Sequence, residues 1–293
     1  MSAIYLILLS VVLYSVGAIL RKQISTIDDT LNYIFTVLFQ ILGGVFVIIF
    51  SVLMGFGGEY SQFIPTIDAY ILIKIIAGAI LWFSATFLSM KALHTVSASK
   101  YSVIETLSPV LSIVLALLFL GEHFVQQQFF GVILIFISVF LVMYDKKTKL
   151  TTFSKGELIA IASTIFSGLA LVNDKGIYLR APLSPTLATL FILPGLLAIL
   201  AQPKELKKLK LIRKNFGVIK QLLIMSAIWS VAAIFYYKAI VLSQSISLVV
   251  SVSQLSVILT VLLGLIFLKE TTNWRKKLLA AVISVVGLIL VSL

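Results

Sequence analysis

Among the acidic residues, Glu105 stands apart because it lies inside an apolar stretch, about seven residues into the run 98–120. In a membrane helix that rises about 1.5 Å per residue, this position is roughly 10 Å from the start of the helix. A charged carboxylate at such depth is costly and usually faces a cavity or a partner. We therefore predict that Glu105 lies on a substrate or ion pathway and binds protons. The alternative is a structural role within a helix bundle.

Other polar residues recur on the same face of this predicted helix. Steps of four, four, three and four residues place five side chains on one face: Ser97, Tyr101, Glu105, Ser108 and Ser112. The run 246–268 offers a second polar stripe: Ser253, Ser256 and Thr260. We expect the two stripes to face each other across a central cavity. The alternative is that these hydroxyl groups only bond to the backbone or to neighbouring helices.

Aromatic residues in other apolar runs are further candidates for the pathway. Trp82, Trp229 and Tyr237 could stack on a cationic or ring-containing substrate, although packing in the core or at the membrane interface also explains such rings. Tyr14 and Asn173 lie in two more runs and are also assigned to the pathway.

Pro109 follows Glu105 by four residues and lacks the backbone N–H that would bond to the carbonyl of residue 105. A kink is therefore expected near Glu105, and Pro109 is a candidate gating residue, with simple packing as the alternative.

The charged residues near the ends of the apolar runs favour structural roles. Asp174 is expected to pair with Lys175 or Arg180, and Glu122 and Glu270 are expected to cap helices or stabilise loops.

Several kinds of chemistry lack their residues. The sequence has no cysteine, and it has no phosphate-binding loop of the G-x-x-x-x-G-K-[ST] type. His94 and His123 lie near different loops, and the Asp28–Asp29 pair does not make the acidic clusters of an intramembrane, metal-dependent transferase. We therefore expect no catalytic residues, no metal site and no cofactor, and a protein that is not an enzyme.

The elements that must position these residues are apolar. The chain is 60% hydrophobic and only 12% charged, with a mean hydropathy of +1.15, which favours a membrane protein. Runs of about 18 residues or more are long enough to span a bilayer as helices, and ten are found: 2–20, 31–54, 70–90, 98–120, 126–144, 155–175, 184–201, 217–240, 246–268 and 274–293. They are too long and too uniform for barrel strands. The first run lacks the flanks of a signal peptide and is expected to be retained.

The two halves of the chain repeat in sequence. WFSATFLSMKAL at 82–93 matches WSVAAIFYYKAI at 229–240, and LSPVLSIVLALLFLGE at 107–122 aligns with LSVILTVLLGLIFLKE at 255–270. We therefore predict an all-α integral membrane protein of ten helices, built as two five-helix repeats, 1–145 and 154–293. Because five is odd, the second repeat must enter the membrane in the opposite sense.

The basic residues are distributed unevenly between the two predicted membrane sides. Of the 23 Lys and Arg residues, all but four fall with the loops that connect odd to even helices, and the four are Lys74, Lys175, Arg180 and Lys238. The positive-inside rule places those basic loops in the cytoplasm and both termini on the non-cytoplasmic side. This distribution also explains the net charge of +12 without nucleic-acid binding.

Several short phrases resemble a known family. Ala92-Leu93, Ser97-Ala98-Ser99, Leu107-Ser108-Pro109-Val110 and Leu120-Gly121-Glu122 are similar to the signature of EamA-type members of the drug/metabolite transporter superfamily. A second copy is similar in Ala239-Ile240, Ser245 to Ser247, Leu255 and Lys269-Glu270, but it departs from the pattern at Lys269 and Val257. The resemblance implies ten helices in an inverted five-plus-five arrangement and secondary transport of small metabolites, often export of amino acids or related solutes.

These observations predict a secondary-active transporter in the cell membrane. It would export amino acids or related small or amine-containing solutes by alternating access, with proton exchange or the substrate gradient as the driving force. Its partners would be the lipid bilayer, the substrate and protons; a monomer is sufficient, and a dimer is compatible with the sequence. An exchanger or flippase of phosphorylated or lipid-linked sugars is the alternative, but it needs deep basic groups, and only Lys100 and Lys175 near span ends were identified.

Overall fold

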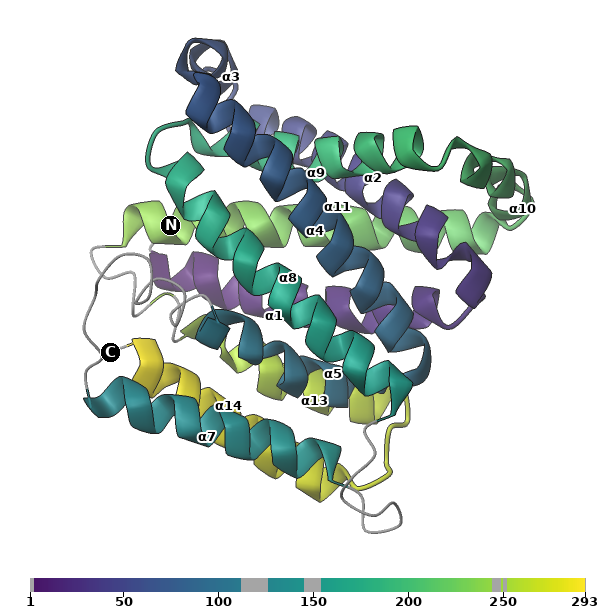
Figure 1. Ribbon diagram of the computed structural model, residues 1–293, viewed down its shortest axis with the longest axis vertical. Coiled ribbons are helices and arrows are strands. Elements are labelled where there is room, and N and C mark those ends of the chain that lie inside the picture. The colour runs from purple at the N-terminus through teal and green to yellow at the C-terminus, as the bar shows by residue number, and fades with distance from the viewer. Residues whose placement is uncertain (1–2, 112–125, 145–153, 244–248, 250–251, 293) are drawn as a thin grey trace.

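The computed structural model describes residues 3–111, 126–144, 154–243, 249 and 252–292 (Figure 1). Over these residues every element is helical and none is a strand. Seven helices or helical stretches are long and apolar enough to cross a membrane. Their helices are α1 (Ala3–Ser25), α2 (Asn32–Leu53), α4 (Ala69–Thr95), α7 (Gln126–Met143), α8 (Lys155–Tyr178), α9 (Leu183–Ala201) and α11 (Phe216–Leu242).

Three further helices pack within the bundle, and short helices lie in the connections. The first three are α5 (Ala98–Glu105), α13 (Leu255–Phe267) and α14 (Trp274–Ser292). The short ones are α3 (Glu59–Phe63), α10 (Leu209–Arg213) and three 3₁₀ helices, η1 (Asp29–Leu31), η2 (Ile64–Thr66) and η3 (Pro203–Lys208).

Two differences from the predicted ranges affect the site. Helix α1 was expected to end at Leu20, but it continues to Ser25, so that Arg21 lies within the helix and is only 5% exposed. A long side chain can remain in a helix end if it finds polar and aromatic partners there, and the hydropathy pattern does not report such partners.

The predicted run 98–120 is interrupted. Helix α5 ends at Glu105, Thr106 forms a turn, and 107–111 are helical again; the rest of the run lies outside the described residues. The interruption falls where Pro109 removes the hydrogen-bond donor to the Glu105 carbonyl, as the sequence predicted.

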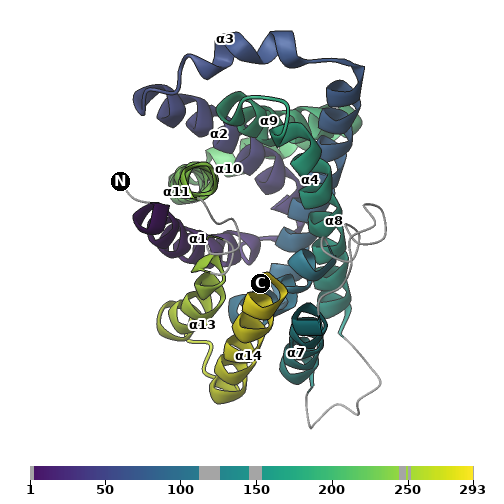
Figure 2. The ribbon, with the colours of Figure 1, turned by 90° about the vertical axis from the view of Figure 1, so that its left-hand side faces the viewer.

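The helices pack in pairs that each join an early and a late part of the chain. Helix α1 packs on α11, α4 on α8, α2 on α9 and α7 on α14. Figure 2 shows these helices around the middle of the bundle. The α7–α14 pair is especially close, because a Cβ added to Gly131 would lie 2.5 Å from the Gly287 carbonyl oxygen. Small residues permit such close approach between membrane helices.

Both described ends of the chain lie on the same side of the bundle, and α10 lies on the opposite side (Figure 1). Large apolar side chains cover the outside, and on α7 the rings of Phe129, Phe136 and Phe140 are all more than half exposed. An apolar exterior of this kind suits a lipid environment.

Candidate transport cavity

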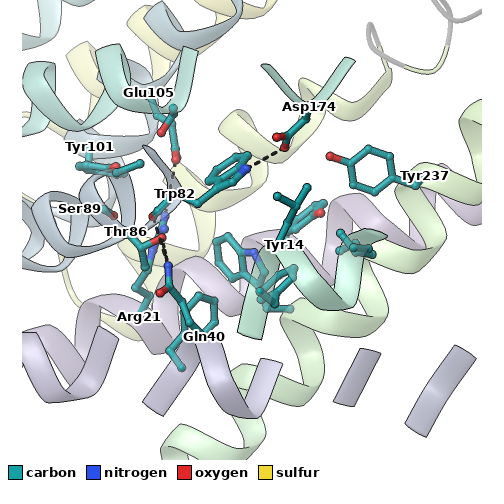
Figure 3. Close-up of a pocket in the computed structure, with 18 of the residues that line it drawn as sticks. Tyr14, Arg21, Gln40, Trp82, Thr86, Ser89, Tyr101, Glu105, Asp174 and Tyr237 are labelled. Atoms are coloured by element: carbon teal, nitrogen blue, oxygen red, sulfur yellow. Dashed lines mark hydrogen bonds and ion pairs between the residues drawn. The ribbon is translucent and has the colours of Figure 1, made fainter. Parts of the chain in front are cut away.

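An ion pair in the middle of the bundle joins α1 to α5. The guanidinium Nη2 of Arg21 on α1 lies 3.7 Å from Oε1 of Glu105, the last residue of α5 (Figure 3). The Arg21 side chain is 7% exposed, whereas the Glu105 side chain is 41% exposed. Glu105 is therefore the more accessible partner, and the cation is held in place by its surroundings.

Two aromatic rings contribute to those surroundings. The centre of the Arg21 guanidinium lies 4.6 Å from the ring centroid of Trp229 and 5.5 Å from that of Tyr101. A cation over aromatic faces gains electrostatic energy, and most when it is withdrawn from water. The Arg21 Nε is buried and has no hydrogen-bond partner among the described residues.

Sequence reasoning missed Arg21 because it was counted with the loop cations. A usable signal was present in the helical periodicity. Tyr14, Gly17 and Arg21 follow each other at three and four residues, so they share one face of α1. Trp229 packs against this face. Its ring centroid is 5.3 Å from that of Tyr14, and a Cβ added to Gly17 would lie 2.7 Å from the Trp229 ring atom Cε3.

A second charged group, Asp174 on α8, lines the same cavity. The residue is 2% exposed, and its Oδ2 accepts a hydrogen bond of 2.7 Å from Nε1 of Trp82. The expected pairing with Arg180 is wrong, because Arg180 instead lies 4.0 Å from Asp68 near the surface. The side chain of Lys175 lies outside what the structure describes. Asp174 was missed because Trp82 lies 92 residues away in sequence.

The cavity consists of two adjoining spaces of about 140 and 310 Å³. Eight residues line both of them: Tyr14, Arg21, Trp82, Tyr101, Glu105, Ser167, Trp229 and Tyr237. The larger space is also lined by five residues of the predicted set: Ser108, Pro109, Ser253, Ser256 and Thr260. The structure therefore brings most of the predicted pathway residues together around one cavity.

Two predicted residues lie elsewhere, and a third is not among the described residues. Asn173 is not part of the cavity lining; its amide donates a 2.8 Å hydrogen bond to the Lys74 carbonyl. Ser97, which was assigned to the polar stripe, caps α5 by accepting from the Lys100 N–H at 3.2 Å. Ser112 lies outside the described residues.

Gln40 on α2 was not singled out from the sequence, although an amide inside an apolar run is a signal of the same kind as Glu105. It lines the smaller space and is 2% exposed. Its Nε2 donates to the Trp82 carbonyl at 3.2 Å and to Thr86 Oγ1 at 3.3 Å. These bonds orient the amide and leave its Oε1 without a partner among the described residues.

Polar contacts join the start of α5 to the connection between α13 and α14. Glu270 accepts from the backbone N–H groups of Ala98 and Ser99 at 2.7 and 3.1 Å, and it lies 3.6 Å from Lys277 Nζ. The expectation that Glu270 caps a helix is confirmed, whereas its counterpart Glu122 lies outside the described residues. Among the described side chains no group of three His, Asp or Glu residues is placed to hold a metal ion.

On the opposite side of the bundle, the short helix α3 contacts two membrane helices. The Glu59 carboxylate accepts from the backbone N–H of Ser184, at the start of α9, at 2.8 Å, and from Lys238, near the end of α11, at 2.9 Å. The Lys238 ammonium also lies 3.5 Å from the ring centroid of Phe56. The Glu59 carboxylate thus links the segment 54–68 to the membrane helices α9 and α11.

Comparisons with known proteins agree with this architecture. A solved structure described only as a crystal structure of a protein is 15% identical, with 97% of this chain and 96% of that chain covered and a TM-score of 0.62. At this identity the likeness concerns the fold alone. The search of curated proteins found no significant match. Residues 1–144 match the model of the EamA-like transporter family. Through these residues the chain belongs to the EamA-like transporter family of the drug/metabolite transporter superfamily, and it is a multi-pass membrane protein.

Proposed function

We propose that the chain is a secondary-active exporter of small metabolites that works by alternating access, with Glu105 as its proton-binding group. The observation that carries the proposal is the ion pair between Arg21 and Glu105 inside the cavity. An acid that is accessible and a cation that is fixed form a pair which a substrate carboxylate can open.

The proposed coupling is a competition for Arg21. When a substrate carboxylate binds the guanidinium, Glu105 loses its cationic partner and takes up a proton from the side to which the cavity is open. When the substrate leaves on the other side, Glu105 releases the proton and pairs with Arg21 again. Substrate and proton therefore cross together and in the same direction, so that the outward substrate gradient drives export and a proton leaves with the substrate.

The arrangement supporting alternating access is a pair of inverted five-helix repeats, 1–145 and 154–293, with ten membrane helices. The proposed order of the ten membrane helices is α1, α2, α4, α5, α7, α8, α9, α11, α13 and α14. Replacing each helix by the one five places away in this order turns the α1–α11 pair into the α8–α4 pair, and it leaves the α2–α9 and α7–α14 pairs unchanged. Trp82 and Trp229, which match in the sequence repeat, both line the cavity. Such symmetry places a site between the repeats near the midplane.

The proposed orientation in the cell membrane has both termini on the non-cytoplasmic side. The support is the excess of Lys and Arg in the loops opposite the termini, from which Arg21 must now be removed because it lies in the cavity. A reporter that is active only in the cytoplasm, fused to the C-terminus, should be inactive. An active fusion would reverse the orientation without affecting the coupling proposal. A monomer encloses the cavity and is the proposed functional unit.

The second candidate is an exchanger or flippase of phosphorylated or lipid-linked sugars. Sequence reasoning held that deep basic groups were missing, and this was wrong, because Arg21 lines the cavity. Glu105 and Asp174 line it as well, however, and two carboxylates repel a phosphate dianion. Thermal-shift measurements with amino acids, amines, nucleotide sugars and lipid phosphates distinguish the candidates, and stabilisation by phosphorylated sugars alone would favour this second one.

The test of the proposal uses the full chain in proteoliposomes with an imposed pH gradient and a panel of amino acids and amines. The wild-type protein should move at least one solute faster with the gradient than without it. Glu105→Gln keeps the shape of the side chain but cannot carry the proton, so the gradient should no longer matter. An unchanged gradient dependence in this variant would contradict the assignment of Glu105.

A further inference from the structure

We propose that Asp174, together with the aromatic rings beside it, is the binding subsite for a positively charged amine of the substrate. The inference rests on the proposed transport function and deepens it. A cavity with Arg21 at one place and Asp174 at another then selects molecules that carry both a carboxylate and an amine.

The first argument is the state of the Asp174 carboxylate. It is nearly fully buried, and the described side chains provide no ion pair for it. Its hydrogen bonds come from Trp82 Nε1 at 2.7 Å and, at the limit of hydrogen-bond distance, from the Asn173 amide at 3.5 Å. A carboxylate has about four acceptor positions. Asp174 therefore has unused acceptor capacity at a surface of the cavity.

The second argument is the aromatic lining beside Asp174. Tyr14, Trp82, Tyr178 and Tyr237 all line the smaller space with it. The rings of Tyr178 and Tyr237 are 4.8 Å apart between centroids, and Figure 3 shows the Tyr237 hydroxyl directed toward Asp174. Aromatic faces attract ammonium groups, and they do so more strongly in a place withdrawn from water. A small anion would gain nothing from these faces.

The third argument is the match to an ammonium group, which has three donors and no acceptor. The acceptor positions that Asp174 leaves unused, with aromatic faces beside them, meet these requirements.

Trp82 connects the two charged parts of the cavity. Its indole N–H bonds to Asp174, and its backbone carbonyl bonds to Gln40, which lines the same space as Arg21. Figure 3 shows Trp82 between Asp174 and the Arg21–Glu105 pair. A substrate with an amine at one end and a carboxylate at the other can contact both parts across this ring.

The test compares three ligands that share one carbon skeleton: L-leucine, 3-methylbutylamine, which lacks the carboxylate, and 4-methylpentanoate, which lacks the amine. Binding to the purified full chain is measured by calorimetry or thermal shift. The wild-type protein should bind leucine most tightly. Asp174→Asn should weaken leucine and the amine at least tenfold and should leave 4-methylpentanoate unchanged.

Two further variants separate charge from folding. Asp174→Glu keeps the charge and should retain binding of the amine. The matched control is Asp29→Asn, the same change at an exposed residue of η1 outside the cavity, which should change none of the three affinities.

The inference is overturned if Asp174→Asn leaves the ratio of the leucine and 4-methylpentanoate affinities unchanged, or if the wild-type protein binds the two equally. It is also overturned if none of the three ligands binds. That last result would not affect the proposed function, which stands or falls with the Glu105-dependent pH-gradient effect measured on the wider solute panel.

Discussion

Arg21 and Asp174 occupy comparable places in two helices, but they have different partners in the cavity. Arg21 is the nineteenth of the 23 residues of α1, and Asp174 is the twentieth of the 24 residues of α8. Because these helices run in opposite directions (Figure 1), the two charges lie toward opposite sides of the bundle. Each contacts a tryptophan of the matched pair, Trp229 for Arg21 and Trp82 for Asp174.

The tryptophans contact their charges in opposite ways. Trp229 presents its ring face to a cation, and Trp82 donates its indole N–H to an anion. Arg21 also has a carboxylate partner, whereas Asp174 has no ion pair among the described side chains. Tryptophans that match in the sequence repeat thus contact charges of opposite sign, and of these two charges only Arg21 is neutralised by an ion pair among the described side chains.

The largest effect is expected from removing the acid of the Arg21 region. Glu105→Gln should abolish the dependence of transport on the pH gradient, because the only proposed proton carrier is lost. Initial rates in proteoliposomes with and without the gradient measure this. If Asp174→Asn abolished the gradient dependence and Glu105→Gln did not, the roles of the two carboxylates would have to be exchanged.

Removing the cation should be next in size. Breaking a fully buried ion pair on one side costs about 3–5 kcal/mol, and because Glu105 is 41% exposed we expect about 1–3 kcal/mol for Arg21→Gln. Thermal unfolding in detergent reports the loss, and adding Glu105→Gln should restore part of it. Arg180→Gln, at a surface pair with 58% exposed side chains, is the matched control and should change little. Equal losses in both variants would contradict the difference in burial.

Substituting the tryptophans should separate the two modes of contact. Trp82→Phe removes the donor to buried Asp174 and should cost about 1–3 kcal/mol. Trp229→Phe keeps an aromatic face over Arg21 and should cost about 1 kcal/mol for the weaker cation contact and the smaller ring. Unfolding of the two variants side by side measures the difference. A larger loss for Trp229→Phe would mean that packing, rather than the hydrogen bond, dominates at these positions.

The smallest effect is expected outside the membrane, at Glu59. Burial alone would raise its pKa, but the bonds from Ser184 and Lys238 outweigh burial, so that its pKa is lowered. The contact therefore contributes at and above the ordinary pKa of a glutamate and is lost only as the pH falls through the lowered value. Glu59→Gln should lower stability by about 0.5–1 kcal/mol at pH 7, with a smaller difference from the wild type in strong acid. A difference that grows as the pH falls would reverse the sign of this argument.

The sequence predicted the elements of the fold better than the contacts of the site. Apolar runs report which segments enter a membrane, and the repeat reports which segments are alike, because both signals are local or periodic. Glu105 and the stripe on 246–268 were found because a polar residue in an apolar run is conspicuous. Gln40 gave the same signal and was overlooked.

Arg21 and Asp174 required information that no local pattern contains. Both lie near the ends of their helices, where charged residues are ordinary and usually reach water. Their partners, Glu105, Trp229 and Trp82, are distant in the chain, and only the packing of α1 on α11 and of α4 on α8 brings them together. The periodicity of Tyr14, Gly17 and Arg21 was the one local signal that pointed inward.

The interruption at Thr106 leaves Glu105 at the end of a helix of only eight residues. So short a helix has little stability of its own and depends on what holds its ends. Its first turn is held by Glu270, which belongs to the late part of the chain. A change in the Glu270 contacts would therefore be expected to shift Glu105, the residue proposed to bind the proton, because only about two turns of helix separate the two ends of α5.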